Sequence, residues 1–375
     1  MIILCKLFKW KEKKENSSIR HDLLVEILCR LPAKSLVRFK AVHSDWFSLI
    51  SDPQFCHRHL QHQRPCQKYG TIQVRNTHTL HPSLSLRIMS TVDDDHQLVE
   101  IQKAFGMEVY GNSLFPSLLG SCHGLLLTSV SFWLENFILW NPTIREYQKI
   151  HRKIFAGSKS NTVAMAGLGY DSLNHNYKIV AAVSYRWQQN TSIEVDIYDL
   201  NKSYWKTKNC HFPYESKSLI TPAITLANGV PHWHVKRKNN DQSVILSFDL
   251  VDEIFKEVPL PYNILDFNFM SAVDGYLCIG IRNSPMDPLH VWKMREYGMK
   301  KSWYVLKMSF PNEFKCRSYL MPLGFLHKDQ IVMSLDTVGI AIFNITRQHY
   351  QFVLQTDNNR CYSVVAYSET LVSPN

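Results

Sequence analysis

The chain has 375 residues, 45% of them hydrophobic, so it can bury the cores of one large domain and one small one. No run of about eighteen apolar residues occurs, and we therefore expect no segment that spans a membrane. The net charge is +10, but residues 1–68 hold 13 Lys and Arg against 6 Asp and Glu, while residues 69–375 hold 29 against 26. Because the larger part is nearly neutral, a nucleic-acid partner is not expected.

The nine cysteines are scattered, odd in number and without a C-x-x-C pair. This pattern indicates free thiols in a reducing compartment, which predicts a cytoplasmic, and possible nuclear, location. The opening residues do not form a secretory signal, because their apolar run breaks at Lys6 and no small-residue cleavage site follows. Residues 1–18 are expected to form a disordered basic tail.

An apolar stripe organises residues 19–60. Leucine and isoleucine at positions 23, 24, 27, 28 and 31 follow the spacing of a helix of about three turns. Pro32 ends this helix and opens a second one, and a third carries Trp46 and stops at Pro53. Three such helices have more apolar surface than so small a unit can bury alone, so we expect a docking module that a partner covers.

The chain after about residue 63 changes to short apolar or alternating runs bounded by Gly, Pro, Asn and Asp, which predicts an all-β region. Five segments share an apolar run that ends in an aromatic residue, with a second aromatic residue several positions later. The five markers are Trp140, Tyr198, Phe248, Trp292 and Phe343, at steps of 58, 50, 44 and 51 residues.

This period suggests a β-propeller. A repeat of roughly 45 residues with two strand pairs is the size of one four-stranded blade, and the length of the region then predicts about six or seven blades. The apolar run at residues 361–367 is expected to close the ring against residues 69–74. The aromatic markers are expected to pack between blades.

Residues 19–62 also resemble the F-box of plant F-box proteins, through motifs such as Arg30-Leu31-Pro32, Trp46 and Pro53-Gln54-Phe55. The resemblance implies that this unit binds a Skp-type adaptor and, through it, a cullin. Two departures from the family pattern, Ile19-Arg20 and Ser44, could weaken that binding. The resemblance implies nine adaptor-binding residues: Leu23, Leu24, Ile27, Leu28, Leu31, Pro32, Leu36, Val42 and Trp46.

Residues 63–375 resemble the F-box-associated, kelch-like propeller, and are most similar to the S-locus F-box-like group. Segments 119–125, 139–145 and 255–261 carry this resemblance. The predicted fold is therefore an α+β multidomain chain with a three-helix F-box and an all-β propeller. The implied function is that of a substrate-recognition subunit of an SCF-type ubiquitin ligase, whose protein substrate is unknown. The alternative is a ligase-independent protein-binding propeller with a degenerate F-box.

We predict no catalytic residues, metal site or cofactor, so the chain is interpreted as a non-catalytic adaptor. The histidines of 57–62 and 232–234 lack partners at metal-ligand spacing, and Cys122-His123 lacks a third orienting group. A propeller hydrolase would need converging carboxylates, for which Asp196, Asp199, Asp249 and Asp252 are the candidates. Trp187 lies outside the repeating aromatic positions and is a weak candidate for a substrate contact.

Overall fold

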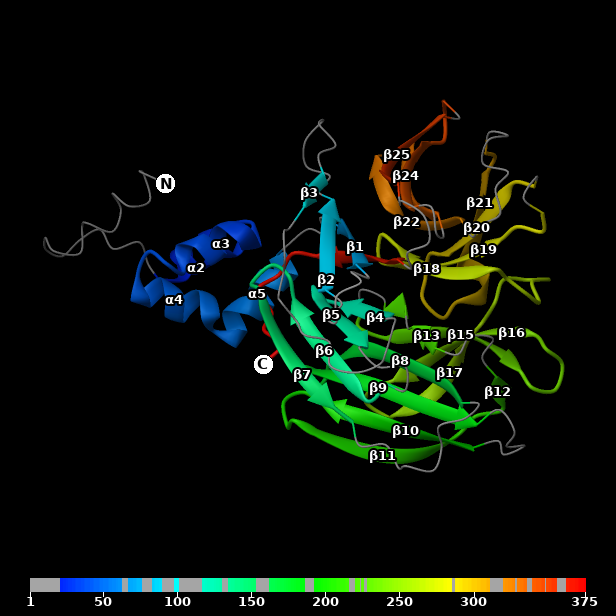
Figure 1. The fold of residues 1–375 in the computed structure, drawn as a ribbon, viewed down its shortest axis with the longest axis horizontal. Helices are drawn as coiled ribbons and strands as arrows, with labels where there is room; N and C mark the ends of the chain where they lie inside the picture. The colour runs from blue at the N-terminus through cyan, green and yellow to red at the C-terminus, as the bar shows by residue number, and fades with distance from the viewer. Residues whose placement is uncertain are drawn as a thin grey trace, which may run out of the picture.

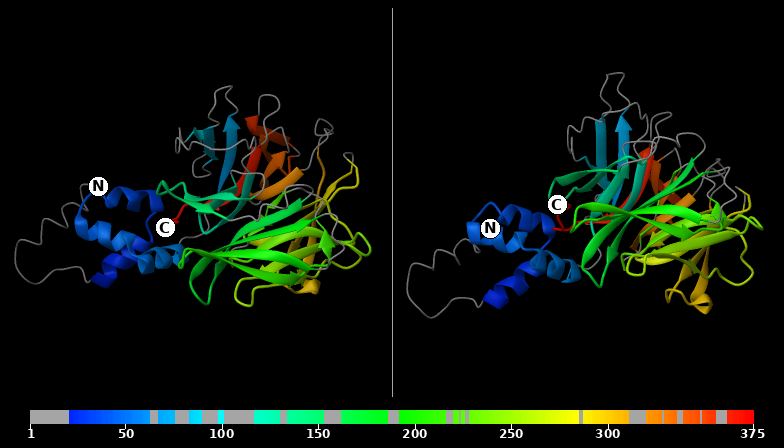
Figure 2. Two further views of the ribbon diagram at one scale, coloured as in Figure 1. Left: turned by 60° about the horizontal axis from the view of Figure 1, so that its bottom comes forward. Right: turned by 90° about the horizontal axis from the view of Figure 1, so that it is seen from below.

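The computed structural model of the chain describes residues 21–62, 67–75, 83–89, 98–100, 117–129, 134–152, 162–185, 192–215, 220–222, 224–225, 228–284, 287–310, 320–327, 329–335, 339–347, 349–355 and 362–375. Helices come first along the chain and strands follow. The helices of residues 21–62, which we call the helical unit, lie at one end of the molecule beside the sheets (Figures 1 and 2).

Four helices build the helical unit. Pro32 lies between the first two and has a φ of −58, which suits the residue before a helical turn. His43 caps the third helix, because its imidazole Nδ1 accepts a hydrogen bond from the backbone N–H of Asp45 at 3.1 Å. The helices are α2 (His21–Cys29), α3 (Ala33–Phe39), α4 (Ser44–Ser51) and α5 (Pro53–His62).

The prediction of three helices is wrong, because Pro53 begins a helix as well as following one. The carboxylate of Asp52 accepts hydrogen bonds from the backbone N–H groups of Gln54 at 2.8 Å and Phe55 at 3.1 Å. These bonds satisfy donors that a helix start leaves without partners, and proline at the first helical position has no N–H to satisfy. The added helix α5 buries Phe55 and His59.

Of the five blades in the described residues, four are built from strands that are consecutive in the chain, and the third adds shorter strands to a consecutive run (Figure 1). Neighbouring strands within each of these runs are antiparallel. The first blade has β4 (Ser117–Cys122), β5 (Leu125–Ser129), β6 (Asn136–Asn141) and β7 (Glu146–His151), and the second has β8 (Thr162–Asp171), β9 (Asn176–Tyr185), β10 (Ser192–Asp199) and β11 (Tyr204–His211).

The third blade is built on β15 (Pro231–Arg237), β16 (Ser243–Asp249) and β17 (Ile254–Val258), with the short β12 (Tyr214–Glu215) and β14 (Ile224–Thr225) both paired to β15. Strand β13 (Ile220–Pro222) instead joins β8 of the second blade in parallel. The fourth blade has β18 (Phe269–Val273), β19 (Tyr276–Ile281), β20 (Leu289–Met294) and β21 (Trp303–Met308), and the fifth has β22 (Leu320–His327), β23 (Gln330–Leu335), β24 (Gly339–Asn344) and β25 (His349–Gln355).

A further sheet joins the two ends of the β region, in the order β26 (Tyr362–Ser368), β1 (Gln67–Arg75), β2 (Ser83–Met89) and β3 (Leu98–Glu100). The predicted closure is confirmed, because Tyr69 pairs with Ala366 and Gln73 with Tyr362. The described residues thus form five blades and one closing sheet shared by both ends of the β region. The predicted count of six or seven blades is therefore wrong. The markers recur at 44 to 58 residues, so dividing the length of the region by a shorter nominal period gave too many blades.

The five aromatic markers lie on equivalent strands, since β6, β10, β16, β20 and β24 each precede the outermost strand of their blade. Trp140, Tyr198, Phe248 and Phe343 are buried. Tyr198, Phe248 and Phe343 lie in the cores between blades, which confirms the prediction for these three markers. Trp292 is partly buried against the core shared by the third and fourth blades. Each blade therefore covers an apolar face of its neighbour, as a propeller requires.

The polar residue after four of the markers has a common structural role. Its side-chain oxygen accepts a backbone N–H two or three residues later, which forms an Asx turn at the tip of the hairpin. Four residues then separate the two strands in each case. These bonds run from Thr143 to Asn141 (2.9 Å), from Lys202 to Asp199 (3.0 Å), from Val251 to Asp249 (2.9 Å) and from Arg347 to Asn344 (2.8 Å).

Candidate functional site

The core of the helical unit is closed around one tryptophan. Trp46 is 4% exposed, and its ring meets Phe39 edge to face at a centroid distance of 5.2 Å. His59 of α5 is fully buried, and its Nε2 lies 2.9 Å from the carbonyl oxygen of Leu31. Burial lowers the pKa of His59. The core of the helical unit is thus closed within this chain, and Leu371 from the C-terminal residues belongs to it.

Large apolar side chains remain on the outside of this unit. The exposed fractions are 56% for Leu23, 47% for Ile27, 54% for Val42 and 55% for Phe47. Leu23 and Ile27 are four residues apart on α2 and therefore share a helix face. The ammonium group of Lys40 lies 5.9 Å from the centre of the Phe47 ring. These residues supply the apolar surface that a helical partner could cover.

The nine residues assigned by resemblance therefore separate into three sets by exposure. Leu23, Ile27, Pro32 and Val42 are exposed, and Leu24 and Leu31 are half-buried. Leu28, Leu36 and Trp46 are buried in the core of the helical unit, so they stabilise the helices rather than present a surface. Phe47 was not among the nine, although the tryptophan beside it was. Nothing in the helical spacing distinguished it, because the orientation of α4 follows from its packing against α3 and α5.

A C-terminal strap, residues 369–375, joins the helical unit to the propeller (Figure 1). Leu371 is 2% exposed and belongs to the core of the helical unit, whereas the next residue, Val372, packs into the core between the first and second blades. Side chains of successive residues in an extended chain point in opposite directions. Here the side chain of Leu371 enters the helical unit and that of Val372 enters the propeller. The Nζ of Lys34 on α3 also lies 2.9 Å from the carboxylate of Glu369.

Asn141, at the end of β6, holds the strap in place. Its side-chain N–H₂ group donates to the carbonyl oxygens of Thr370 at 3.1 Å and Val372 at 2.8 Å. The hydroxyl of Thr370 donates in turn to the carbonyl oxygen of His123 at 2.8 Å. Gly124 follows with a φ of +80, and a Cβ there would lie 2.5 Å from the carbonyl oxygen of Ser368. Only glycine therefore fits the turn over which the strap crosses.

Aromatic rings form a second contact between the two domains. The ring of His57 on α5 lies 5.1 Å from that of His175 and 6.4 Å from that of Tyr170, both in the second blade. The hydroxyl of Tyr170 and Nδ1 of His175 are 3.0 Å apart, and Tyr177 and His123 are joined by a similar bond of 3.1 Å. The helical unit is thus held against the propeller by the strap and by α5, and Ile144 of the first blade packs on its core.

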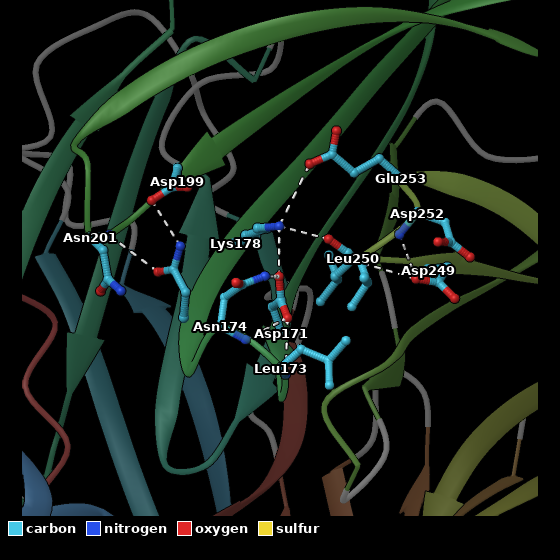
Figure 3. Close-up of polar contacts among 12 residues, drawn as sticks. Asp171, Leu173, Asn174, Lys178, Asp199, Asn201, Asp249, Leu250, Asp252 and Glu253 are labelled. Carbon is cyan, nitrogen blue, oxygen red and sulfur yellow. Dashed lines mark hydrogen bonds and ion pairs between the residues drawn. The ribbon is translucent and has the colours of Figure 1, made fainter.

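A buried lysine connects the second and third blades (Figure 3). The Nζ of Lys178 lies 2.9 Å from the carboxylate of Asp171, 2.6 Å from the carbonyl oxygen of Leu250 and 3.6 Å from the carboxylate of Glu253. Although burial alone would raise the pKa of Asp171, hydrogen bonds from Asn174 and Lys178 lower it. We call this group the Lys178 clamp, and its geometry is that of a structural ion pair.

The hydrolase alternative is not supported by the four carboxylates considered for it. Asp199 and Asp249 accept backbone N–H groups in their hairpin turns, as Figure 3 shows for Asp249. Asp196 bonds to Arg152 and Thr207, and Asp252 lies 3.1 Å from the Nζ of Lys256. All four carboxylates therefore cap turns or form polar contacts with neighbouring side chains, and they do not converge on a common point as catalytic carboxylates would.

The other chemical candidates also have structural roles. His232 Nδ1 lies 2.9 Å from the carbonyl oxygen of Val230, and His234 stacks on Phe267 at 3.9 Å. Burial raises the pKa of the Cys122 thiol, which disfavours the thiolate a nucleophile needs. Among the described residues, no group of three or more His, Cys, Asp or Glu side chains could hold a metal ion. Trp187 lies outside the described residues.

The structure combines a small helical unit with a β-propeller, which is the two-domain arrangement that the sequence predicts. Comparison with known families agrees: the family described as "F-box associated beta propeller domain" matches residues 76–374, and the family described as "F-box domain" matches residues 21–58. The chain therefore belongs to the F-box proteins that carry an F-box associated β-propeller.

Two relatives align with nearly the whole chain. An F-box/kelch-repeat protein of Arabidopsis thaliana is 29% identical over 377 residues, covering 94% of this chain and 95% of its own length. The F-box protein CPR1 of the same plant is 26% identical over 384 residues, covering 95% and 89%. The resemblance to the S-locus F-box-like group remains a prediction.

Solved structures resemble the chain more weakly. TolB from Acinetobacter baumannii aligns with a TM-score of 0.44 and 10% identity, covering 80% of this chain and 66% of TolB. Within the described residues, no helix is long and apolar enough to cross a membrane.

Proposed function

We propose that this protein is the substrate-recognition subunit of an SCF-type ubiquitin ligase. In this role the helical unit binds a Skp-type adaptor, the adaptor binds a cullin, and the propeller binds the protein to be ubiquitinated. The chain performs no bond chemistry of its own. It acts by proximity, because holding a substrate beside a charged ubiquitin carrier raises their effective concentration.

The observation that carries the proposal is the division of apolar residues in the helical unit. Its core is complete, yet Leu23, Ile27 and Phe47 remain about half exposed. Exposed apolar side chains of this size, grouped on one small unit, are typical of an interface. The proposed adaptor surface is therefore Leu23, Ile27, Pro32, Val42 and Phe47, with the half-buried Leu24 and Leu31 at its edge.

The strap supports the proposal in a second way. A receptor that works by proximity gains from a fixed distance and angle between its two binding units, because a flexible joint lowers the effective concentration. Leu371 and Val372 anchor the strap in both domains, and His57 adds a contact from α5. The free cysteines of the described residues, such as Cys29 and Cys278, are consistent with the reducing cytoplasmic or nuclear location that this role requires.

The test is direct binding of the purified full-length chain to a recombinant plant Skp-type adaptor, measured by calorimetry. The double variant Leu23→Ala/Ile27→Ala should weaken binding at least about tenfold, because it truncates two exposed anchors. Helical circular dichroism at 222 nm should be unchanged, since substitutions at exposed positions have little effect on stability. Variants of Leu36 or Trp46 are less informative, because both side chains are core residues.

The matched control is Leu173→Ala/Val251→Ala, which truncates two apolar side chains that are 73% and 44% exposed on the propeller. This variant should bind the adaptor as the unmodified chain does. Equal affinity of the Leu23→Ala/Ile27→Ala variant would contradict the proposed surface. Failure of the unmodified chain to bind any Skp-type adaptor would instead favour a protein-binding propeller that acts outside the ligase.

A further inference from the structure

One hairpin departs from the repeat. The strands of the equivalent hairpins β6–β7, β10–β11, β16–β17 and β24–β25 are joined by four residues. The fourth blade joins β20 to β21 through residues 295–302, which include a 3₁₀ turn at Lys300–Ser302. The position after the marker Trp292 is Lys293 rather than Asn or Asp. Insertions within single repeats often form the binding face of a repeat protein. We call residues 295–302 the fourth-blade loop.

The fourth-blade loop is ordered by its own hydrogen bonds. The hydroxyl of Ser302 lies 2.8 Å from the carbonyl oxygens of Glu296 and Met299 and 3.1 Å from the N–H of Glu296. The backbone N–H of Ser302 also donates to the carbonyl oxygen of Met299 at 2.9 Å. Gly298 turns the loop with a φ of +79. A loop that is already ordered loses little entropy when it binds a partner.

Aromatic and apolar side chains of this loop and its neighbour are exposed. Tyr297 is 46% exposed and Met299 54%, and Tyr262 of the β17–β18 connection is 56% exposed. The Nζ of Lys300 lies 4.6 Å from the centre of the Tyr262 ring, which joins the two segments. The hydroxyl of Tyr297 is 2.7 Å from Nε2 of His232, which holds that ring in one orientation.

Among the described residues, the positive charge beside these side chains has no carboxylate counterion. The guanidinium of Arg295 lies 4.4 Å from the centre of the Tyr304 ring, and Lys300 lies over Tyr262. No carboxylate of the described residues comes within ion-pair distance of Arg295, Lys300 or Lys301. Glu296 is the one acidic residue of the loop. By contrast, Lys256 beside the equivalent hairpin of the third blade lies 2.6 Å from Asp249 and 3.1 Å from Asp252.

We propose that the fourth-blade loop and Tyr262 form a docking site for an acidic peptide segment that carries a bulky apolar side chain. The uncompensated cations attract the carboxylates of such a segment, and Met299 with the tyrosine rings covers its apolar residue. The fourth blade lies at the end of the molecule away from the helical unit, so a peptide there leaves the adaptor surface free (Figure 1). This inference rests on the proposed function, because it assigns the chemistry of the substrate segment.

The experiment is selection from a random twelve-residue peptide library displayed on phage, against the immobilised full-length chain. Enriched peptides should carry several Asp or Glu residues beside an aromatic or large aliphatic one. The best enriched peptide, made with a fluorescent label, should bind the variant Lys300→Glu/Lys301→Glu about tenfold more weakly than the unmodified chain. Raising the salt concentration should weaken its binding to the unmodified chain, because the attraction is between exposed charges. Met299→Ala should also weaken binding.

The matched control Lys149→Glu/Lys202→Glu changes the charge by the same amount at exposed lysines of the first and second blades. It should leave peptide affinity unchanged. The proposal is overturned if enriched peptides are not acidic, if both double variants bind the peptide equally, or if a single-stranded 20-mer DNA competes more strongly than the peptide. Adaptor binding should be normal in Lys300→Glu/Lys301→Glu and peptide binding normal in Leu23→Ala/Ile27→Ala, so this inference and the proposed function fail in different assays.

Discussion

The helical unit and the propeller differ in how many of their polar and apolar side chains have partners within the chain. The propeller closes its hairpin ends with Asx turns and pairs buried charges such as Lys178 with Asp171. The helical unit has a complete core around Trp46 but leaves Leu23 and Ile27 about half exposed. A scaffold gains stability when its polar and apolar groups have internal partners, whereas a docking unit must keep some without partners. The fourth-blade loop resembles the helical unit in this respect, which is why we assign binding to both.

The largest loss of stability is expected when a substitution removes the Lys178 clamp, because the propeller then loses an internal partner for a buried charge. Lys178→Met should lower the free energy of unfolding of the propeller by about 3 to 5 kcal/mol, because it leaves the buried carboxylate of Asp171 without its cation. The matched control is Lys256→Met, since Lys256 follows Asp249 by seven residues just as Lys178 follows Asp171. That pair is solvent-exposed and should contribute at most about 1 kcal/mol.

Both variants can be compared by urea unfolding monitored through tryptophan fluorescence. Similar losses in Lys178→Met and Lys256→Met would show that the buried clamp is no more important than a surface ion pair. The helical signal at 222 nm should stay unchanged in both variants at low urea concentration.

Substitutions in the strap should cause smaller losses of stability, and each should act on a different domain. Leu371→Ala should destabilise the helical unit by about 3 kcal/mol, because it empties a site in that core. Val372→Ala removes less volume and acts on the propeller core instead, so it should cost about 1 kcal/mol. The measurement is thermal unfolding followed at 222 nm for the helices and by fluorescence for the propeller. If both variants shift the same transition, the strap does not connect two separate cores.

The smallest expected effect is a pH dependence confined to the helical unit. Burial lowers the pKa of His59 in the folded state, so the unfolded chain binds a proton first as the pH falls. The helical unit should therefore lose stability as the pH falls through the ordinary histidine value of 6.5, and it should keep that stability above this pH. His59→Gln should flatten the dependence of the 222 nm transition between pH 7.5 and 5.5. An unchanged slope in His59→Gln would assign the effect to other histidines.

Local pattern was sufficient for much of the architecture. The spacing of Leu23 to Leu31 predicted a helix, and the recurring aromatic markers predicted stacked blades of similar size. The apolar run after residue 361 predicted the pairing of β26 with β1. These features depend on the periodicity of one segment or on the similarity of several, both of which are visible in the linear chain.

Tertiary packing decided the rest. The stripe on α2 is broad, and only its packing in the helical unit determines that Leu28 is buried while Leu23 and Ile27 remain exposed. Leu371 and Val372 are ordinary apolar residues in sequence, and only the docking of two domains sends them into different cores. The sequence by itself therefore determined most of the helices and strands, because regular structure depends on the local spacing of apolar residues. Only the folded chain decided which side chains face water, because burial depends on neighbours that are distant along the chain.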